Sequence, residues 1–227
     1  MKKLFSRYTP LQIAVHAYAW SELVVLIYKF FTHDLTANPI QYLEQRTGRH
    51  AITLLVLSIA CTPLNTLFRW SQLLKRRRAL GLYAFMYATI HVLIFVNLDY
   101  GLAWSLIVQT IFQKPYIVVG LTGFLLLIPL AWTSFDIWKK RLGKGWKRLH
   151  QLIYFIMPLV LLHYAWSKKG DVFRLSGDIV RPLIYTLIAA ILLLMRVPPI
   201  RRAIASIPDR ILSLFRKRAP HPEVNAS

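Results

Sequence analysis

Four histidines lie inside long apolar stretches of the sequence, where an ionisable side chain is costly and therefore indicates a function. They are His16, His91, His150 and His163. An imidazole at membrane depth can bind a metal, take part in a proton relay or hydrogen-bond a neighbouring helix. The remaining histidines are expected in polar segments, where a solvated imidazole needs no special explanation; they are His33, His50 and His221.

The spacing of the four histidines predicts two levels in the membrane. With a rise of about 1.5 Å per residue, His91 lies roughly 16 Å into its span and His163 lies roughly 20 Å beyond His150. His91 and His163 are therefore expected to share a level in the outer half of the membrane, on different helices, as the two axial ligands of a haem require. We predict that His150 and His16, which lies about two turns into the first span, bind a second haem on the inner side.

The interval between the two histidines of the fifth span raises a geometric difficulty. Thirteen residues separate His150 from His163, which leaves their side chains about 140° apart on an ideal helix. Pro158 lies between them and is expected to kink or re-register the helix, so that both imidazoles face the bundle.

Two other uses of these histidines are open. A single histidine in a membrane span is often an interhelical hydrogen-bonding group, and a proton relay normally includes acids, of which the apolar core holds Glu22. Four histidines on two levels favour haem. The single cysteine, Cys61, excludes a disulfide framework and a Cys-x-x-Cys-His attachment site, so the haem is expected to be b-type and held without a covalent bond.

The elements that position the histidines are six apolar segments, each long enough to cross a hydrocarbon core. Hydrophobic residues make up 56% of the 227-residue chain, which predicts an all-α integral membrane bundle. The predicted spans are Pro10 to Phe31, Ala51 to Phe68, Leu80 to Asn97, Tyr116 to Phe135, Gln151 to Trp166 and Pro182 to Val197. A shorter apolar piece, Leu102 to Phe112, is expected to be an interfacial or re-entrant helix.

The charge distribution predicts the orientation. The net charge of +20 comes from basic runs between the spans, so membrane topology explains it better than nucleic-acid binding. With the N-terminus inside, 21 of the 29 Lys and Arg residues are cytoplasmic and 7 are outside, which places both termini in the cytoplasm. Residues 1–199 are predicted to form the membrane domain, and residues 200–227 a basic, partly amphipathic tail that contacts membrane lipid.

Several motifs resemble one known family. The run Leu142 to Tyr154 (LGKGWKRLHQLIY), followed by His163 to Ser167 (HYAWS), is similar to the haem-binding membrane subunit of the bacterial periplasmic methionine sulfoxide reductase system, the MsrQ (YedZ) family. Further matches are Thr47 to Arg49, Thr62 to Leu64 and Arg77 to Leu82, together with His91 and the first-span His16. The resemblance covers about residues 10 to 200.

The resemblance implies a ferric-reductase-like transmembrane domain in the bacterial inner membrane. Such a domain passes electrons from the quinone pool, or from a cytosolic flavin reductase, to a periplasmic molybdenum-cofactor subunit. That partner reduces methionine sulfoxide to the thioether, so the resemblance implies that this chain is an electron-transfer subunit rather than the catalytic one. The resemblance also implies FMN binding, although the sequence has no flavin motif.

Three arginines are candidate cofactor-binding residues. Arg49, at the outer mouth of the second span, is expected to pair with a propionate of the outer haem, with an ordinary interface arginine as the alternative. Arg77 and Arg78 stand where the wider superfamily has a histidine of the third span, which leaves the haem count at one or two. They are candidates for pairing with haem propionates or a flavin phosphate, or are solvated charges that set topology.

Two other functions, and a docking surface, complete the expectations. A stand-alone ferric reductase needs a flavin and nicotinamide domain, for which the chain has no GxGxxG motif, and a haem-free transporter or scaffold is the second alternative. Electrons are expected to leave near the segment from Ser167 to Arg181. Its charged residues are expected to steer a transient partner; they are Lys168, Lys169, Asp171, Arg174 and Asp178.

Overall fold

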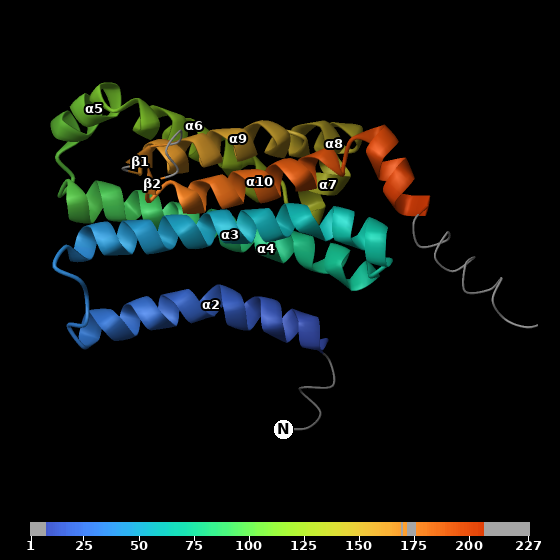
Figure 1. Cartoon of the computed structure of the whole chain (residues 1–227), viewed down its shortest axis with the longest axis horizontal. Helices are drawn as coiled ribbons and strands as arrows, with labels where there is room; N and C mark the ends of the chain where they lie inside the picture. The colour runs from blue at the N-terminus through green and yellow to red at the C-terminus, as the bar shows by residue number, and fades with distance from the viewer. Residues whose placement is uncertain (1–7, 169, 172–175, 207–227) are drawn as a thin grey trace, which may run out of the picture.

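Long apolar helices run side by side along the long axis of the molecule in the computed structural model, which describes residues 8–168, 170–171 and 176–206 (Figure 1). The all-α prediction is confirmed, and the structure adds one antiparallel pair of strands of two residues each. The elements are α2 Pro10–Phe31, α3 Pro39–Phe68, α4 Ser71–Leu93, the π-helix η1 Ile94–Asp99, α5 Trp104–Gln113, α6 Pro115–Trp132, α7 Asp136–Leu142, α8 Lys144–His150, α9 Ile153–Trp166, β1 Gly170–Asp171, β2 Ser176–Gly177 and α10 Val180–Leu194.

Five segments of the described chain are long and apolar enough to cross a membrane, and a sixth is a bent pair. The five are α2, α3, α4 with η1, α6, and α8 with α9. The sixth joins α10 to a helix at Pro198–Ser206 across a bend of 82°. This agrees with the predicted six spans, and it corrects the last of them, since α10 ends at Leu194 and the chain then turns.

The second span begins at Pro39 rather than at Ala51. The Asn38 side chain accepts a hydrogen bond from Gln41 N at 3.1 Å, and Pro39 occupies the first turn, both of which favour a helix start. The first turns of α3 are polar, so hydropathy alone did not predict that the helix begins there. As a result the expectation of a solvated His50 was wrong: it is 7% exposed, with its ring 4.8 Å from Tyr18 and 4.5 Å from Tyr87.

The short apolar piece predicted at Leu102 to Phe112 is α5, which lies at one end of the bundle, beyond α4 and α6 (Figure 1). It buries Ile107 and exposes Leu106 and Phe112. The opposite end carries α7 and α8, the start of α2 and the helix Pro198–Ser206 (Figure 1). Both ends of the described chain therefore lie at the same end of the bundle.

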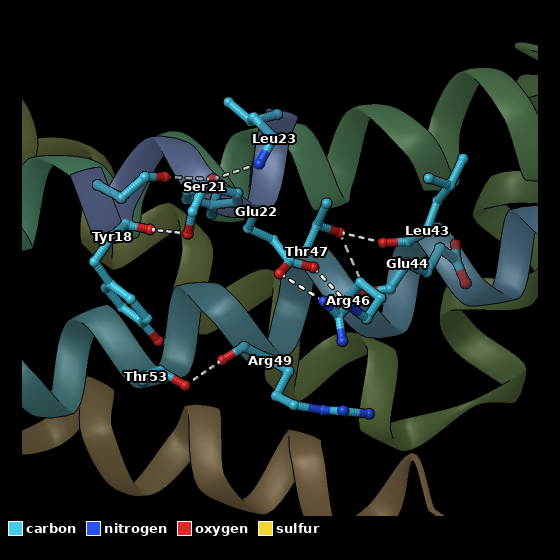
Figure 2. Close-up of polar contacts among 12 residues, drawn as sticks. Tyr18, Ser21, Glu22, Leu23, Leu43, Glu44, Arg46, Thr47, Arg49 and Thr53 are labelled. Atoms are coloured by element: carbon cyan, nitrogen blue, oxygen red, sulfur yellow. Dashed lines mark hydrogen bonds and ion pairs between the residues drawn. The ribbon is translucent and has the colours of Figure 1, made fainter. Parts of the chain in front are cut away.

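Helix α2 buries few side chains, which are Ala19 and Leu26. Polar contacts therefore contribute to its attachment to the bundle. The Tyr87 hydroxyl donates to Ala19 O at 2.5 Å and accepts from Leu23 N at 3.2 Å, so it stands between two groups of the helix backbone ladder. Arg46 of α3 holds Glu22 by two hydrogen bonds of 2.5 and 2.7 Å (Figure 2). These contacts explain how an isolated acid is tolerated in an apolar span.

Removing one partner of the Glu22 and Arg46 pair is expected to destabilise the protein. Glu22→Gln leaves the Arg46 guanidinium without its counter-charge, at a cost of about 1 to 2 kcal/mol, because the Arg46 side chain is 33% exposed and solvent screens part of the loss. A thermal unfolding scan of the detergent-solubilised protein measures the loss as a lower Tm. The double variant Glu22→Gln and Arg46→Gln is the control, because it removes both charges and is expected to recover part of the stability. Equal Tm values for wild type and Glu22→Gln contradict this role.

Candidate functional site

His91 of α4 and His163 of α9 face each other across the bundle. Their ring centroids are 6.2 Å apart, with the ring planes at 77°. Two imidazoles on opposite sides of one metal have centroids roughly 6 Å apart, because a metal to imidazole bond is about 2 Å and each nitrogen lies about 1 Å from its ring centre. The prediction that the two histidines share a level is confirmed, and their separation fits two axial ligands.

Backbone carbonyls fix the tautomer of both rings. His91 Nδ1 is 3.0 Å from Glu44 O, and His163 Nδ1 is 2.7 Å from Tyr116 O. A carbonyl only accepts, so each Nδ1 carries the proton and donates it, which leaves the lone pair on each Nε2 free. This is the arrangement in which proteins present histidine to a metal, with the second nitrogen held by a hydrogen bond.

A glycine makes room for each ring. Gly48 lies four residues after Glu44, and Gly120 lies four residues after Tyr116, so each glycine is one helical turn beyond the carbonyl that a histidine uses. A Cβ added at Gly48 comes within 3.2 Å of His91 Nδ1, and one added at Gly120 overlaps the ring of His163. The missing side chains open two notches that seat the imidazoles against α3 and α6.

The two rings line a cavity of about 490 Å³ between α3, α4, α6 and α9, within the size range of cofactor sites. Its walls are mostly apolar and include Ala84, Ala88 and Phe124. The π-helix η1 starts three residues after His91 and contributes Phe95 to the lining, and such irregular turns are frequent at functional sites. Among the described residues, no group of three or more His, Cys, Asp or Glu side chains could hold a metal ion. The two facing imidazoles in the cavity wall fit a cofactor that two histidines would hold.

Polar side chains without partners line the same cavity. Arg49 Nε and the Tyr164 hydroxyl are buried, and neither makes a hydrogen bond of normal geometry within the described residues, although the two side chains are neighbours. In Figure 2 the Arg49 guanidinium points away from the Glu22 and Arg46 ion pair. A guanidinium with a free Nε donor and no acid within ion-pair distance among the described residues fits an anionic group of a bound cofactor, and a haem propionate is such a group.

Replacing Arg49 by glutamine is expected to lower the midpoint potential of the haem. The reduced state carries one more negative charge, so loss of a nearby cation destabilises it, by tens of millivolts on a scale of about 59 mV per tenfold change in the equilibrium constant. A spectroscopic redox titration of the purified protein measures the shift. The double variant Glu22→Gln and Arg46→Gln is the control, since it removes another guanidinium together with the acid that engages it; an unchanged potential in Arg49→Gln identifies Arg49 as an ordinary interface residue.

Lys168, which was expected to belong to an exposed docking segment, lines the cavity instead. Its side chain is 9% exposed and its ammonium lies 3.8 Å from Asp178, whose side chain is 73% exposed. Burial lowers the pKa of Lys168, and Asp178 partly opposes this by raising it. Lys168 therefore belongs to the cavity wall rather than to a freely exposed docking surface. The side chains of Lys169, Asp171 and Arg174 lie outside the described residues.

The two inner candidates occupy separate environments. His150 Nε2 is 3.1 Å from Thr133 Oγ1 and its ring lies 4.1 Å from Trp146, whereas His16 Nδ1 is 2.7 Å from the Tyr83 hydroxyl. Within the described residues the structure shows no ring contact between His16 and His150, in contrast to the outer pair.

Both histidines of the fifth span nevertheless face α6, as His150 contacts Thr133 and His163 contacts Tyr116. The interruption between them is not where the sequence suggested. Helix α8 ends at His150 and α9 begins at Ile153, so the register changes at Gln151 and Leu152, while Pro158 lies inside α9. Both this break and Pro158 therefore lie between the two histidines that face α6.

Arg77 and Arg78 do not line the cavity of His91 and His163. Arg78 Nη1 is 3.1 Å from Asp136 Oδ1, and its guanidinium lies over the Phe135 ring at 5.5 Å. The Arg77 carbonyl accepts a hydrogen bond from Ser58 Oγ at 2.9 Å. The residues that the sequence reasoning missed are Gly48 and Gly120, and a glycine within an apolar span was the signal available for them.

Comparisons with known proteins place the chain in a family. Residues 47–161 match the family described as ferric reductase like transmembrane component. The chain is 41% identical over 190 residues, covering 81% of this chain and 84% of the relative, to the protein-methionine-sulfoxide reductase heme-binding subunit MsrQ of Xanthomonas campestris pv. campestris (strain 8004). It is 41% identical over 167 residues, covering 73% and 74%, to the protein of the same name from Herminiimonas arsenicoxydans. No solved structure matches. The chain therefore belongs to the MsrQ family of heme-binding membrane subunits of protein-methionine-sulfoxide reductases, with a ferric-reductase-like transmembrane domain.

Proposed function

We propose that the chain holds a b-type haem between His91 and His163 and carries electrons outward across the bacterial inner membrane to a periplasmic molybdenum-dependent methionine sulfoxide reductase. The observation that carries this proposal is the pair of imidazoles 6.2 Å apart that line one cavity, each with its Nδ1 held by a carbonyl. Haem iron supplies a one-electron carrier. The donor in this proposal is the quinone pool or a cytosolic flavin reductase.

The chain's own residues have distinct roles in this proposal. His91 and His163 present Nε2 to the metal, while the carbonyls of Glu44 and Tyr116 hold the rings and strengthen them as ligands. Arg49 compensates the negative charge of a propionate. The apolar walls exclude water, which favours one-electron chemistry over side reactions.

The orientation and the inner site are parts of the same proposal. Both ends of the described chain lie at the α8 end of the bundle (Figure 1), and the basic runs at that end favour a cytoplasmic location. An inner haem between His150 and His16, and FMN binding, stay predictions. A stand-alone ferric reductase or a haem-free scaffold is the alternative that the experiment must exclude.

The test is a dithionite-reduced minus oxidised difference spectrum of the purified protein, with pyridine-haemochrome quantification per polypeptide. A b-type α-band at one or two haems per chain is the expected result, and its absence overturns the haem proposal. Reoxidation of the reduced protein is then followed with the periplasmic reductase and methionine sulfoxide. Reoxidation that needs both additions supports the proposed partner, whereas equally fast reoxidation by a ferric chelate alone favours the ferric reductase.

A further inference from the structure

The end of α10 forms a basic pocket that the haem site does not use. Pro198 and Pro199 cannot continue the α10 hydrogen-bond ladder, and the helix Pro198–Ser206 turns by 82° across the end of the bundle (Figure 1). A pocket of about 240 Å³ lies at this bend and is lined by Arg196, Pro198, Arg201, Arg202 and Ala205. Three of its five lining residues are cations.

One of these cations is fixed in place by the fold. Pro63, inside α3, has no N–H to bond the carbonyl of Ile59 one turn earlier. Arg196 Nη2 fills this vacancy at 2.5 Å from Ile59 O, and the guanidinium also lies 5.7 Å from the centre of the Tyr154 ring. Arg196 Nε is buried and has no hydrogen-bond partner in the described part of the chain. The guanidinium is thus held at the pocket with donor capacity left over.

The pocket has excess positive charge. Within residues 8–168, 170–171 and 176–206, no acid lies within ion-pair distance of Arg196, Arg201 or Arg202. Arg77 adds to the excess, because it lies close enough to Arg196 for their charges to interact unfavourably. Several cations around a concave site, with no counter-charge among the described residues, fit a phosphate group, which guanidinium binds by paired hydrogen bonds.

An apolar surface continues from the pocket along the bundle. Helix α10 exposes a row of large aliphatic side chains, which are Ile184, Leu187, Ile188, Ile191 and Leu194. The row ends at Leu194, four residues before the pocket residue Pro198. A ligand with a phosphate head and acyl chains matches both features, since the head meets the arginines and the chains follow α10.

We propose that this pocket binds the headgroup phosphate of an anionic phospholipid. The phosphate chemistry is shared with soluble phosphates, and the acyl chains distinguish the two sources. The site is separate from the cavity that His91 and His163 line, so its occupancy and the haem content can be measured independently of each other.

The test is native mass spectrometry of the full chain in detergent with phosphatidylglycerol or phosphatidylcholine. Wild type is expected to retain one phosphatidylglycerol in preference to phosphatidylcholine. The double variant Arg201→Gln and Arg202→Gln is expected to bind it about thirtyfold more weakly, since each cation near an anionic headgroup strengthens binding roughly fivefold. Arg196 is left intact because of its bond to Ile59 O.

Two further variants separate this site from general attraction. Lys140→Gln with Lys144→Gln removes the same charge from exposed positions in α7 and α8, and is expected to retain the lipid. Ala205→Leu fills the pocket without changing charge and is expected to lose it. Equal lipid binding by the two double variants overturns the proposal, as does displacement of the lipid by millimolar inorganic phosphate. An unchanged Soret band in every variant shows that the outcome does not depend on the haem proposal.

Discussion

Replacing either His91 or His163 by alanine is expected to abolish the outer haem and all outward electron transfer. In the proposed site each variant removes one of the two imidazoles that would hold the haem, and the remaining one is held by its carbonyl and does not replace the lost ligand. Loss of a hydrogen bond that supports a metal ligand typically weakens metal binding by about 10 to 100-fold. Loss of the ligand itself is expected to weaken haem binding by at least as much. The measurement is haem per polypeptide by pyridine haemochrome, with the reduced α-band recorded on the same sample.

His33→Ala serves as the matched control, because that histidine is exposed between α2 and α3. Full haem content in both ligand variants contradicts the assignment of the cavity. His150→Ala and His16→Ala extend the experiment to the inner side. A fall from two haems to one in both of these variants supports the inner pair, and a fall in His150→Ala alone makes His16 a structural residue hydrogen-bonded to Tyr83.

The outer histidine pair was accessible from the sequence because helix rise is regular. Counting residues along two apolar segments is enough to place His91 and His163 at one depth, and the structure puts their rings 6.2 Å apart. The all-α membrane fold followed from segment length and composition in the same way. The depth of a residue in the membrane and the composition of a span each depend on one helix at a time. Such properties can be predicted from a single sequence.

Features that depend on two helices were not accessible. The buried state of His50 arises because α3 continues outward to Pro39 through polar residues, and those residues are tolerated because Arg46 meets Glu22 on another helix. Likewise, the chain between His150 and His163 is interrupted at Gln151 and Leu152, a position that no proline marks. For His50, a partner on a neighbouring helix decides the outcome.

The roles of Gly48 and Gly120 also could not be predicted from the sequence. Gly48 was part of a motif that supported the family resemblance, and Gly120 was one glycine among others in an apolar span. Their meaning depends on the histidine that reaches them from α4 or α9. The spacing of four residues between the accepting carbonyl and the glycine predicts a place for the imidazole only once the carbonyl that the histidine contacts is known.

Gly120→Ala is therefore expected to be the most damaging of the three substitutions Gly48→Ala, Gly120→Ala and Gly145→Ala. The added Cβ overlaps the His163 ring and comes closest to Nδ1, the atom that donates to Tyr116 O, so the ring must rotate or shift out of its notch. The loss of that hydrogen bond and of the ligand's orientation is expected to weaken haem binding by about 10 to 100-fold. Haem content of the purified variant and the low-temperature electron paramagnetic resonance signal of its ferric form measure the change.

Two other glycines provide the comparison that makes this prediction specific. In Gly48→Ala the new Cβ lies 3.2 Å from His91 Nδ1, a contact that a shift of a few tenths of an ångström relieves, so haem is expected to stay bound with an altered resonance signal. In Gly145→Ala nothing lies within 4 Å of the new Cβ, and wild-type haem content is expected. The predicted order of haem loss is Gly120→Ala, then Gly48→Ala, then Gly145→Ala. Equal haem content in Gly120→Ala and Gly145→Ala shows that the notch on α6 does not position His163 for the metal.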